Sequence, residues 1–349
     1  MDKNILVIGN GFDIYHGLET KYYDFVQYTM QVNSKEKIVD ARIYDICEKN
    51  MFIKYFQDAA NANGGWIDCE KDIEMISHIF SKIINNDHAL EVSGAINEKV
   101  ILENELRVLE YAKGYIKHSK STMTGLEWWG INSKYKHIFN IINKELMIRD
   151  LVKDLNEFIE TFYYYLKQEI NNKPIEVLSN QIKNINFSYV INFNYTNTYR
   201  IYNINDKDVC FIHGSVTSGA DSMVLGTRDN GNANLDFIYF RKYFQRIQKK
   251  VGSLDLEKIN SYQDVDSHGF VTHGDINMYF FGHSLSSTDG DIIKKIEDLS
   301  NKMVIYYYDQ KDYEQKVINL IDVFGKEKAL ELINDGKAEF VELEEAIKR

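Results

Sequence analysis

The stretch Ile5-Leu-Val-Ile-Gly-Asn-Gly-Phe-Asp13 decides the fold, because a short apolar run ends there in a glycine-rich turn. An uninterrupted apolar run such as Ile5–Ile8 is typical of a strand buried on both faces of a parallel sheet. Gly9 and Gly11 let the backbone turn tightly and bring a ligand close to bare N–H groups at the start of the next helix. The turn therefore predicts a phosphate-bearing ligand at the end of the first strand.

Two features of this turn depart from the full dinucleotide-binding fingerprint. A third glycine would be needed at Ile14, where we expect the helix to begin, and Asp13 places a negative charge where phosphate would lie. The turn by itself leaves two interpretations open. It is either part of a nucleotide site or an ordinary strand-to-helix turn in which Asp13 is the N-cap.

The composition is that of a globular protein and argues against several kinds of site. The 349 residues, of which 44% are hydrophobic, are enough for a buried core in one large or two ordinary domains. The net charge of −11 argues against general binding to nucleic acid or anionic membrane and favours a small ligand or protein partners, with homo-oligomers left open. Cys47, Cys69 and Cys210 lack zinc or disulfide-framework spacing, so we expect no metal and a cytoplasmic location. We also expect no signal peptide and no membrane helix.

The overall pattern predicts an α/β fold, with a Rossmann-like, mostly parallel sheet flanked by helices and a large all-helical insertion after the first strand. From about residue 22 to 174, apolar residues recur at helical spacing, most clearly in the stripe Leu151, Leu155, Phe158, Phe162 and Tyr165. The only proline, Pro174, ends this region. We therefore assign residues 1–21 and 175–349 to a discontinuous Rossmann domain and residues 22–174 to a helical insertion domain.

Polar residues follow several of the predicted strands. These strands cover residues 5–8, 187–193, 209–212, 222–225, 276–281, 303–308 and 339–343. The carboxyl ends of parallel strands meet at one edge of a sheet, where ligands bind. Gly, Asn, His, Ser or Thr gather after four of these strands, at residues 9–13, 194–198, 213–215 and 282–289. Their convergence would favour an enzyme active site over loops that are polar by chance.

Three positions at these strand ends are chemically suggestive. His213 is the candidate general base, because imidazole titrates near neutral pH and the following glycine lets a substrate approach. The Asn194 amide offers donors and an acceptor that would fix a sugar hydroxyl or a water. Thr288 and Asp291 have capping-box spacing for a helix that begins near Asp289, which predicts a further anion or ribose site. Each position alone also has a structural explanation, as a buried histidine, a turn former or a helix cap.

Two other groups receive a structural interpretation. Five potential metal ligands lie close together in the sequence, at Asp264, Asp266, His268, His273 and Asp275. Their spacing matches no metal-binding signature, so we interpret this segment as a loop. An amphipathic helix from about Phe240 to Val251 carries Arg241, Lys242, Lys249 and Lys250 on its polar face. This pattern favours a solvated basic face over a nucleic-acid site, with an anionic partner or a neighbouring subunit as the alternative.

Taken together, the motifs resemble the AbiH family of bacteriophage abortive-infection proteins. The resemblance runs over nearly the whole chain and rests on Ile8–Asp13, His16–Leu18, Thr20, Asp24–Phe25, Trp66–Glu70, Asn192–Thr196, Ile212–Gly214 and Gly282–Leu285. That family in turn resembles the sirtuin-like NAD-binding fold. The resemblance therefore implies that the strand ends surround NAD, as substrate or as ligand.

The resemblance also implies roles for individual residues. Asn194 and His213 would occupy the catalytic positions, Gly9 and Gly11 would approach the pyrophosphate, and Gly282 and Ser284 would line the adenosine half. With the turn and helix-start positions included, the predicted NAD-binding residues are Gly9, Asn10, Gly11, Phe12, Asp13, Thr196, Gly282, His283, Ser284 and Asp289. Thr196 replaces an acidic residue of the sirtuin pattern, and Asp13 replaces a small or hydroxyl residue. The absent zinc ribbon argues against protein deacylation and for NAD hydrolysis.

Three functional hypotheses follow. The first is an anti-phage enzyme that hydrolyses NAD at the nicotinamide–ribose bond through Asn194 and His213 and responds to a phage-derived trigger. The second is a sensor that binds a nucleotide or an NAD derivative without turnover. The third is a metal-dependent nuclease that uses Asp13, Asp289 and Asp291.

Overall fold

The computed structural model describes residues 2–62, 67–85, 103–120, 122, 127–136, 142–175, 177–228, 235–260, 263–265, 271–345 and 347–348. The chain forms two compact units. The first consists of Met1–Lys21, Tyr163–Val224 and Arg246–Arg349, and the second of Tyr22–Phe162 and Leu225–Gln245. These units differ from the domains assigned above at two points. The helical unit ends at Phe162 and not near Pro174, and residues 225–245 belong to it.

The first unit is built on a six-stranded sheet in which every pairing is parallel. Its spatial order is β11-β10-β9-β1-β5-β6. The strands are β1 (Lys3–Ile8), β5 (Phe187–Asn192), β6 (Val209–Phe211), β9 (Ile276–Phe281), β10 (Lys302–Tyr307) and β11 (Ala338–Glu342). The predicted α/β fold with a parallel sheet flanked by helices is confirmed, and all the predicted strands but one are present.

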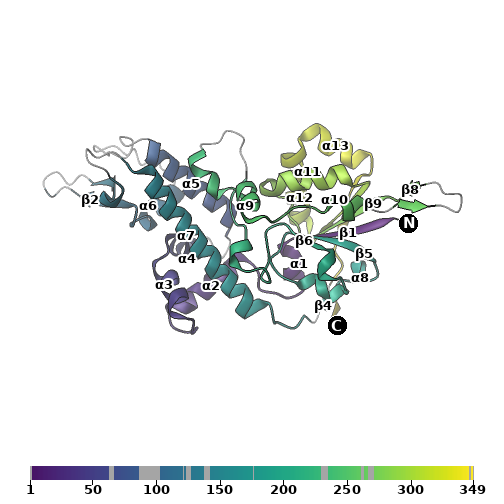
Figure 1. Ribbon diagram of the computed structural model, residues 1–349, viewed down its shortest axis with the longest axis horizontal. Helices are drawn as coiled ribbons and strands as arrows, with labels where there is room; N and C mark the ends of the chain where they lie inside the picture. Colours follow the sequence, from purple (N-terminus) through teal and green to yellow (C-terminus); the bar gives the residue numbers. More distant parts are fainter. Residues whose placement is uncertain are drawn as a thin grey trace. The chain divides into compact units, whose positions relative to one another are not determined.

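Both faces of this sheet are covered by helices, which explains why its strands are apolar at successive positions. Ile5 and Val7 pack into a core with α11 (Gly290–Leu299), α12 (Gln310–Phe324) and α13 (Lys326–Asn334). Leu6 and Ile8 point to the opposite face and pack with α1 (Asn10–Tyr15) and α8 (Asn180–Lys183). Figure 1 shows the first three helices on one side of the strands and the other two on the opposite side.

The strand order shows where the winding direction of the sheet reverses, which is between β1 and β9. β1 pairs with β5 on one side and with β9 on the other. The chain therefore winds outward from β1 in one direction and from β9 in the other, as in doubly wound sheets. Ligands of such sheets bind outside the carboxyl ends of the strands where the winding reverses. The loops that follow Ile8 and Phe281 lie at this position.

The second unit is mainly helical. Its helices are α2 (Tyr22–Asn33), α3 (Ala41–Lys49), α4 (Met51–Ala62), α5 (Cys69–Asn85), α6 (Glu103–Tyr111) and most of α7 (Lys144–Tyr165). The predicted apolar stripe of α7 is confirmed, because Leu151, Leu155, Phe158 and Phe162 are all buried. An antiparallel hairpin of β2 (Ile116–Lys120) and β3 (Glu127–Ile131) interrupts the helices. The prediction of an all-helical insertion is therefore wrong for this hairpin, whose second strand is rich in β-favouring tryptophan and isoleucine.

One predicted strand, at residues 222–225, is wrong. Its Val224 N–H donates to His213 O (2.8 Å) and does not join a strand ladder. Met223 and Val224 are nevertheless buried. An apolar run that is buried but does not pair with a neighbouring strand gives the same sequence pattern as a strand.

The segment interpreted as a loop around His268 contains a short hairpin. Gln263–Val265 (β7) and Val271–His273 (β8) pair antiparallel. Asp266 and His268 lie outside the described residues. Among the described residues, no helix is both long and apolar enough to cross a membrane.

Short elements complete the fold. They are η1 (Ser133–Tyr135), the π-helical turn η3 (Leu166–Ile170), β4 (Val177–Leu178) paired with β12 (Ile347–Lys348), η4 (Thr198–Tyr202), η5 (Asp206–Asp208), η6 (Ala220–Ser222), η7 (Leu235–Phe240), α9 (Lys242–Lys249), α10 (Leu256–Asn260) and η8 (Ser287–Asp289).

Candidate functional site

The loops after β1 and β9 cross with their backbones in contact. Gly11 N–H donates to Gly282 O (2.9 Å), and Gly9 N–H donates to Phe281 O (3.2 Å). Gly282 has a φ of +69°, and a Cβ on it would lie 1.9 Å from Phe12 N. The glycines are therefore required by the close crossing of two loops. The expectation of bare N–H groups at Gly9 and Gly11 is wrong, because the carbonyls of Phe281, at the end of β9, and Gly282, just after it, accept from them.

The helix after the turn begins earlier than predicted, at Asn10. Its N-cap is Gly9, without a capping side chain, so the interpretation of Asp13 as the N-cap is wrong. Asn10 Oδ1 accepts a hydrogen bond from the Thr20 hydroxyl (2.6 Å). Phe12 is buried in the core of the unit. These two predicted ligand contacts are thus engaged with the protein itself.

Asp13 is a buried carboxylate with only one oxygen satisfied. Thr196 Oγ1 donates to Asp13 Oδ2 (2.5 Å), and Thr198 Oγ1 lies 3.1 Å from Thr196 Oγ1. The second oxygen, Asp13 Oδ1, is buried without a hydrogen-bond partner. Burial raises the pKa of Asp13 to about 6, although the hydrogen bond from Thr196 and the nearby polar groups of Thr198 and Asn194 act in the opposite direction. A buried acceptor without a donor is destabilising, so Oδ1 is where a ligand hydroxyl or N–H would be favourable.

Asn194 connects the end of β5 to the end of β1. Its side-chain Nδ2 donates to Gly9 O (2.9 Å), and its backbone N–H donates to Asn192 Oδ1 (2.8 Å). Asn192 Nδ2 in turn donates to Thr196 O (3.0 Å). The amide of Asn194 is therefore held in one orientation beside Asp13 and Thr196.

His213, just after β6, contacts two oxygen acceptors. Its Nε2 lies 2.9 Å from Asp289 Oδ1, and its Nδ1 lies 3.2 Å from Phe193 O. Both the imidazole and the Asp289 carboxylate are buried. The shorter contact, to the carboxylate, fixes the orientation of the ring. The nitrogen that could exchange its partner for a substrate is Nδ1.

Arg246, on α9, completes this group and was not predicted. Its guanidinium pairs with Asp291, and its Nη1 lies 3.9 Å from Asp289 Oδ1. Nη1 is buried and makes no hydrogen bond. α11 starts at Gly290, which confirms the predicted helix start near Asp289. The predicted capping role of Asp291 gives way to its ion pair with Arg246, because a buried guanidinium needs a carboxylate partner.

The loop after β9 supplies mainly structural contacts. His283 is buried with its ring 4.2 Å from that of Phe193, and its Nδ1 accepts from Leu285 N–H (3.0 Å). Buried Lys316, also not predicted, donates to His283 O (2.9 Å). Ser284 is exposed. The side chains of His283 and Ser284 therefore differ in position, one inside the protein and the other on its surface.

The structure thus forms two adjoining groups of polar side chains at the winding reversal of the sheet. Asp13, Asn194 and Thr196 make up the first, and His213, Asp289 and Arg246 make up the second. Phe193 joins them, because its carbonyl contacts His213 and the next residue in the chain is Asn194. Within the described part of the chain, no group of three His, Cys, Asp or Glu could hold a metal ion.

The comparisons with known proteins place this chain in a family. The family described as "Bacteriophage abortive infection AbiH" matches residues 5–310, which include both groups of polar side chains. Neither the curated proteins nor the solved structures contained a match. The match spans most of the chain and both compact units. The chain therefore belongs to the AbiH family of bacteriophage abortive-infection proteins.

Proposed function

We propose that this AbiH protein hydrolyses NAD at the nicotinamide–ribose bond and thereby stops phage-infected cells. The supporting observation is a pair of unsatisfied buried atoms in the two polar groups, the acceptor Asp13 Oδ1 and the donor Arg246 Nη1. A nucleotide matches both, since its ribose hydroxyls donate hydrogen bonds and its phosphates accept them from guanidinium groups. NAD carries both kinds of group.

The chemical step would be divided between His213 and Asn194. Water adds to C1′ of the nicotinamide ribose while the bond from C1′ to the ring nitrogen breaks, and the electron pair of that bond stays with nicotinamide. The products are nicotinamide, ADP-ribose and a proton. His213 Nδ1 accepts this proton, and Asp289 stabilises the resulting imidazolium. Asn194, whose amide is fixed by Gly9 O, orients the ribose or the water.

The resting arrangement also supports a need for activation. Asp13, Asn194 and His213 are each at most 5% exposed. In addition, Nδ1 of His213 must give up its 3.2 Å contact with Phe193 O before it can accept a proton. A phage-derived trigger that opens the site would meet both requirements. Such restraint is what a toxic activity in the cytoplasm needs.

Release of nicotinamide from NAD by the purified protein, with and without lysate of phage-infected cells, tests this proposal. We expect His213→Ala and Asn194→Ala each to lower the rate by about 100-fold or more. Asn184→Ala changes an exposed asparagine at the end of α8 and should keep the wild-type rate. Equal rates in all four proteins would overturn the assignment.

A second function, nucleotide sensing without turnover, is supported by one observation. Both ring nitrogens of His213 already face protein oxygens, which would leave the histidine structural. Calorimetry with NAD and ADP-ribose separates the two functions. Tight binding of NAD by triggered protein that releases no nicotinamide would favour the sensor.

A further inference from the structure

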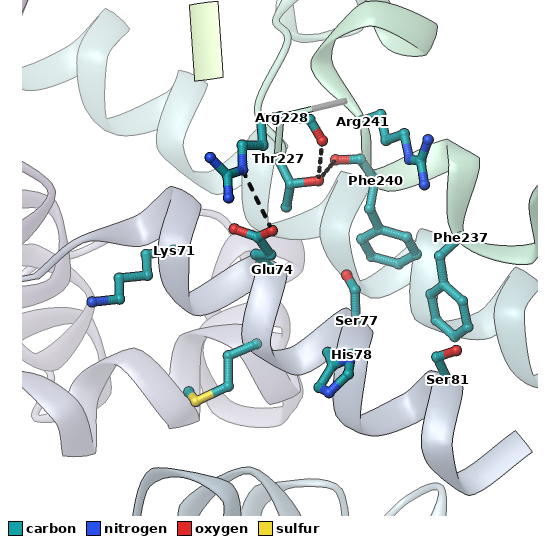
Figure 2. Close-up of a pocket in the computed structure, with 11 residues that line it drawn as sticks. Lys71, Glu74, Ser77, His78, Ser81, Thr227, Arg228, Phe237, Phe240 and Arg241 are labelled. Carbon is teal, nitrogen blue, oxygen red and sulfur yellow. Dashed lines mark hydrogen bonds and ion pairs between the residues drawn. The ribbon is translucent and has the colours of Figure 1, made fainter. Parts of the chain in front are cut away.

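A separate cavity lies wholly within the helical unit. It has a volume of about 420 Å³, and its lining residues come from α5 and from the Leu225–Gln245 segment. Figure 2 shows Ser77 and Ser81 projecting from α5 towards Phe240 and Phe237 of that segment. Binding pockets for small molecules measure roughly 300–1,000 Å³, so the cavity is large enough for such a ligand.

The cavity is positively charged although the chain as a whole is acidic. Among the described residues that line it are three cations, Lys71, Arg228 and Arg241, and one carboxylate, Glu74. Arg228 Nε lies 3.9 Å from Glu74 Oε1, an ion pair drawn in Figure 2. Three cations against one carboxylate make an anion the favoured occupant, in a chain whose net charge is −11.

The rest of the lining suits a flat ring that carries hydroxyl groups. Phe237 and Phe240 have ring centroids 5.9 Å apart and are both buried. Aromatic faces of this kind stack against planar rings. Ser77, Ser81 and Thr227 add hydroxyl groups; those of Ser77 and Thr227 donate to Ile73 O (2.8 Å) and Phe240 O (3.4 Å) and can accept hydrogen bonds from a ligand.

The Leu225–Gln245 segment, which carries Arg228, Arg241, Phe237 and Phe240, is held in shape by backbone hydrogen bonds. Thr227 N–H donates to Phe240 O (2.7 Å), and Lys242 N–H donates to Thr227 O (3.0 Å). A Cβ on Gly226 would lie 2.2 Å from Phe240 O, so only glycine allows this approach.

Lys242 also connects the Leu225–Gln245 segment to α5 through an ion pair. Its buried Nζ pairs with Glu70 Oε1 (2.6 Å). The expectation that Lys242 belongs to a solvated basic face is therefore wrong. Because a buried ion pair is costly unless its geometry is well defined, this contact fixes the segment against the start of α5.

We propose that this cavity is a second ligand site, for a small phosphorylated aromatic molecule of the nucleoside monophosphate class. Arg228 and Arg241 bind the phosphate, since a planar guanidinium matches phosphate oxygens in pairs. The base packs against Phe237 and Phe240. This proposal is independent of the activity proposed for His213 and stands or falls by itself.

The methyl group of Met75, which lines the cavity, provides a local probe for the test. The full-length protein is labelled at its methionine methyl groups, the Met75 resonance is assigned with Met75→Leu, and AMP is titrated. We expect a saturable shift of the Met75 resonance, a weaker response to adenosine, and no comparable shift with inorganic phosphate.

Substitutions of the cavity arginines distinguish specific binding of AMP in the cavity from non-specific electrostatic attraction. Arg228→Gln and Arg241→Gln should each weaken AMP binding by about tenfold, the loss expected for one charge-assisted hydrogen bond. Arg149→Gln on α7, whose side chain is 74% exposed, is the matched control and should not change the affinity. The remaining methionine resonances report whether each variant is folded. The proposal is overturned if Met75 does not respond to millimolar AMP, or if all three arginine variants bind AMP equally.

Discussion

Thr196 Oγ1 donates a 2.5 Å hydrogen bond to Asp13 Oδ2 across a sequence separation of 183 residues, while Asp13 Oδ1 has no partner. This contact joins the end of β5 to the helix that follows β1. A carboxylate that is buried and half-satisfied lowers stability, and such groups are typical of functional sites. The pair therefore marks the position at which we propose that a ligand binds.

Asp13→Asn should make the protein more stable at neutral pH and weaken its ligand binding. The pKa of Asp13 is raised from 3.8 to about 6, so the folded state binds the extra proton between these values. Wild-type protein therefore gains stability from this group as the pH falls from about 6 towards 4. Asparagine removes the buried charge, and the gain at pH 7 should reach about 3 kcal/mol.

Urea unfolding at pH 7 and pH 4 measures this effect. The difference between Asp13→Asn and wild type should be largest at pH 7 and vanish near pH 4. A variant that is less stable than wild type at pH 7 would show that the carboxylate is satisfied in the resting protein.

The contribution of His16 to the stability of the protein should have the opposite pH dependence to that of Asp13. Its Nδ1 donates to Phe12 O (2.6 Å), and Tyr202 OH, which accepts from Ser179 N–H, donates to His16 Nε2 (2.8 Å). Burial lowers the pKa of His16 from 6.5 to about 4. The unfolded chain therefore binds more protons between these values, and stability from this group is lost as the pH falls from 6.5 to 4, by about 3 kcal/mol.

Proton NMR of the His16 ring during a pH titration measures this pKa directly. We expect the ring to stay neutral down to about pH 4. Titration at 6.5 would contradict the buried hydrogen-bonded arrangement. His16→Gln provides the assignment and should remove this part of the pH dependence.

Gly282→Ala should prevent the two loops from crossing. A Cβ there would lie 1.9 Å from Phe12 N, so we expect a loss of at least about 3 kcal/mol of unfolding free energy. Gly336 has the same φ of +69°, but a Cβ on it would meet no atom within 4 Å, which makes Gly336→Ala the matched control. It should cost only the left-handed backbone penalty of about 1 kcal/mol. Equal losses in urea unfolding would show that the contact is unimportant.

A ligand in the helical cavity should be sensed at His213. The Leu225–Gln245 segment that lines the cavity is preceded by Val224, whose N–H donates to His213 O (2.8 Å). It is followed on α9 by Arg246, whose Nη1 lies 3.9 Å from Asp289 Oδ1. Saturation with AMP should therefore shift the His213 ring resonance, and Arg241→Gln should weaken that response. A His213 signal that stays unchanged while Met75 responds would show that the two sites are uncoupled.

The sheet was predictable because buried parallel strands have a strong local signature. Ile5–Ile8 and Ile276–Phe281 are apolar runs that end in glycine, and both are central strands. Residues 222–225 carry a similar apolar signal, but their hydrogen-bond partner is a loop carbonyl, which local sequence cannot specify. Strand order and the meeting of the loops at Gly11 and Gly282 likewise depend on contacts that are distant in sequence.

The sequence did not reveal that several cations are buried. Arg246 and Lys316, which were missed as residues of the site, and Lys242, which was expected on a solvated face, are each at most 5% exposed, although arginine and lysine are ordinarily found on the surface. Their burial follows from carboxylate or carbonyl partners on other elements, such as Asp291 and His283 O. A pattern of residue types along one helix contains no information about those partners.

The NAD content of bacteria that express this protein, measured during phage infection, tests the central proposal most directly. Cells with the wild-type protein should lose NAD and accumulate nicotinamide before they lyse. Cells with His213→Ala or Asn194→Ala at equal protein levels should keep their NAD and release phage. Wild-type cells that stop the phage while their NAD content stays constant would contradict the proposal.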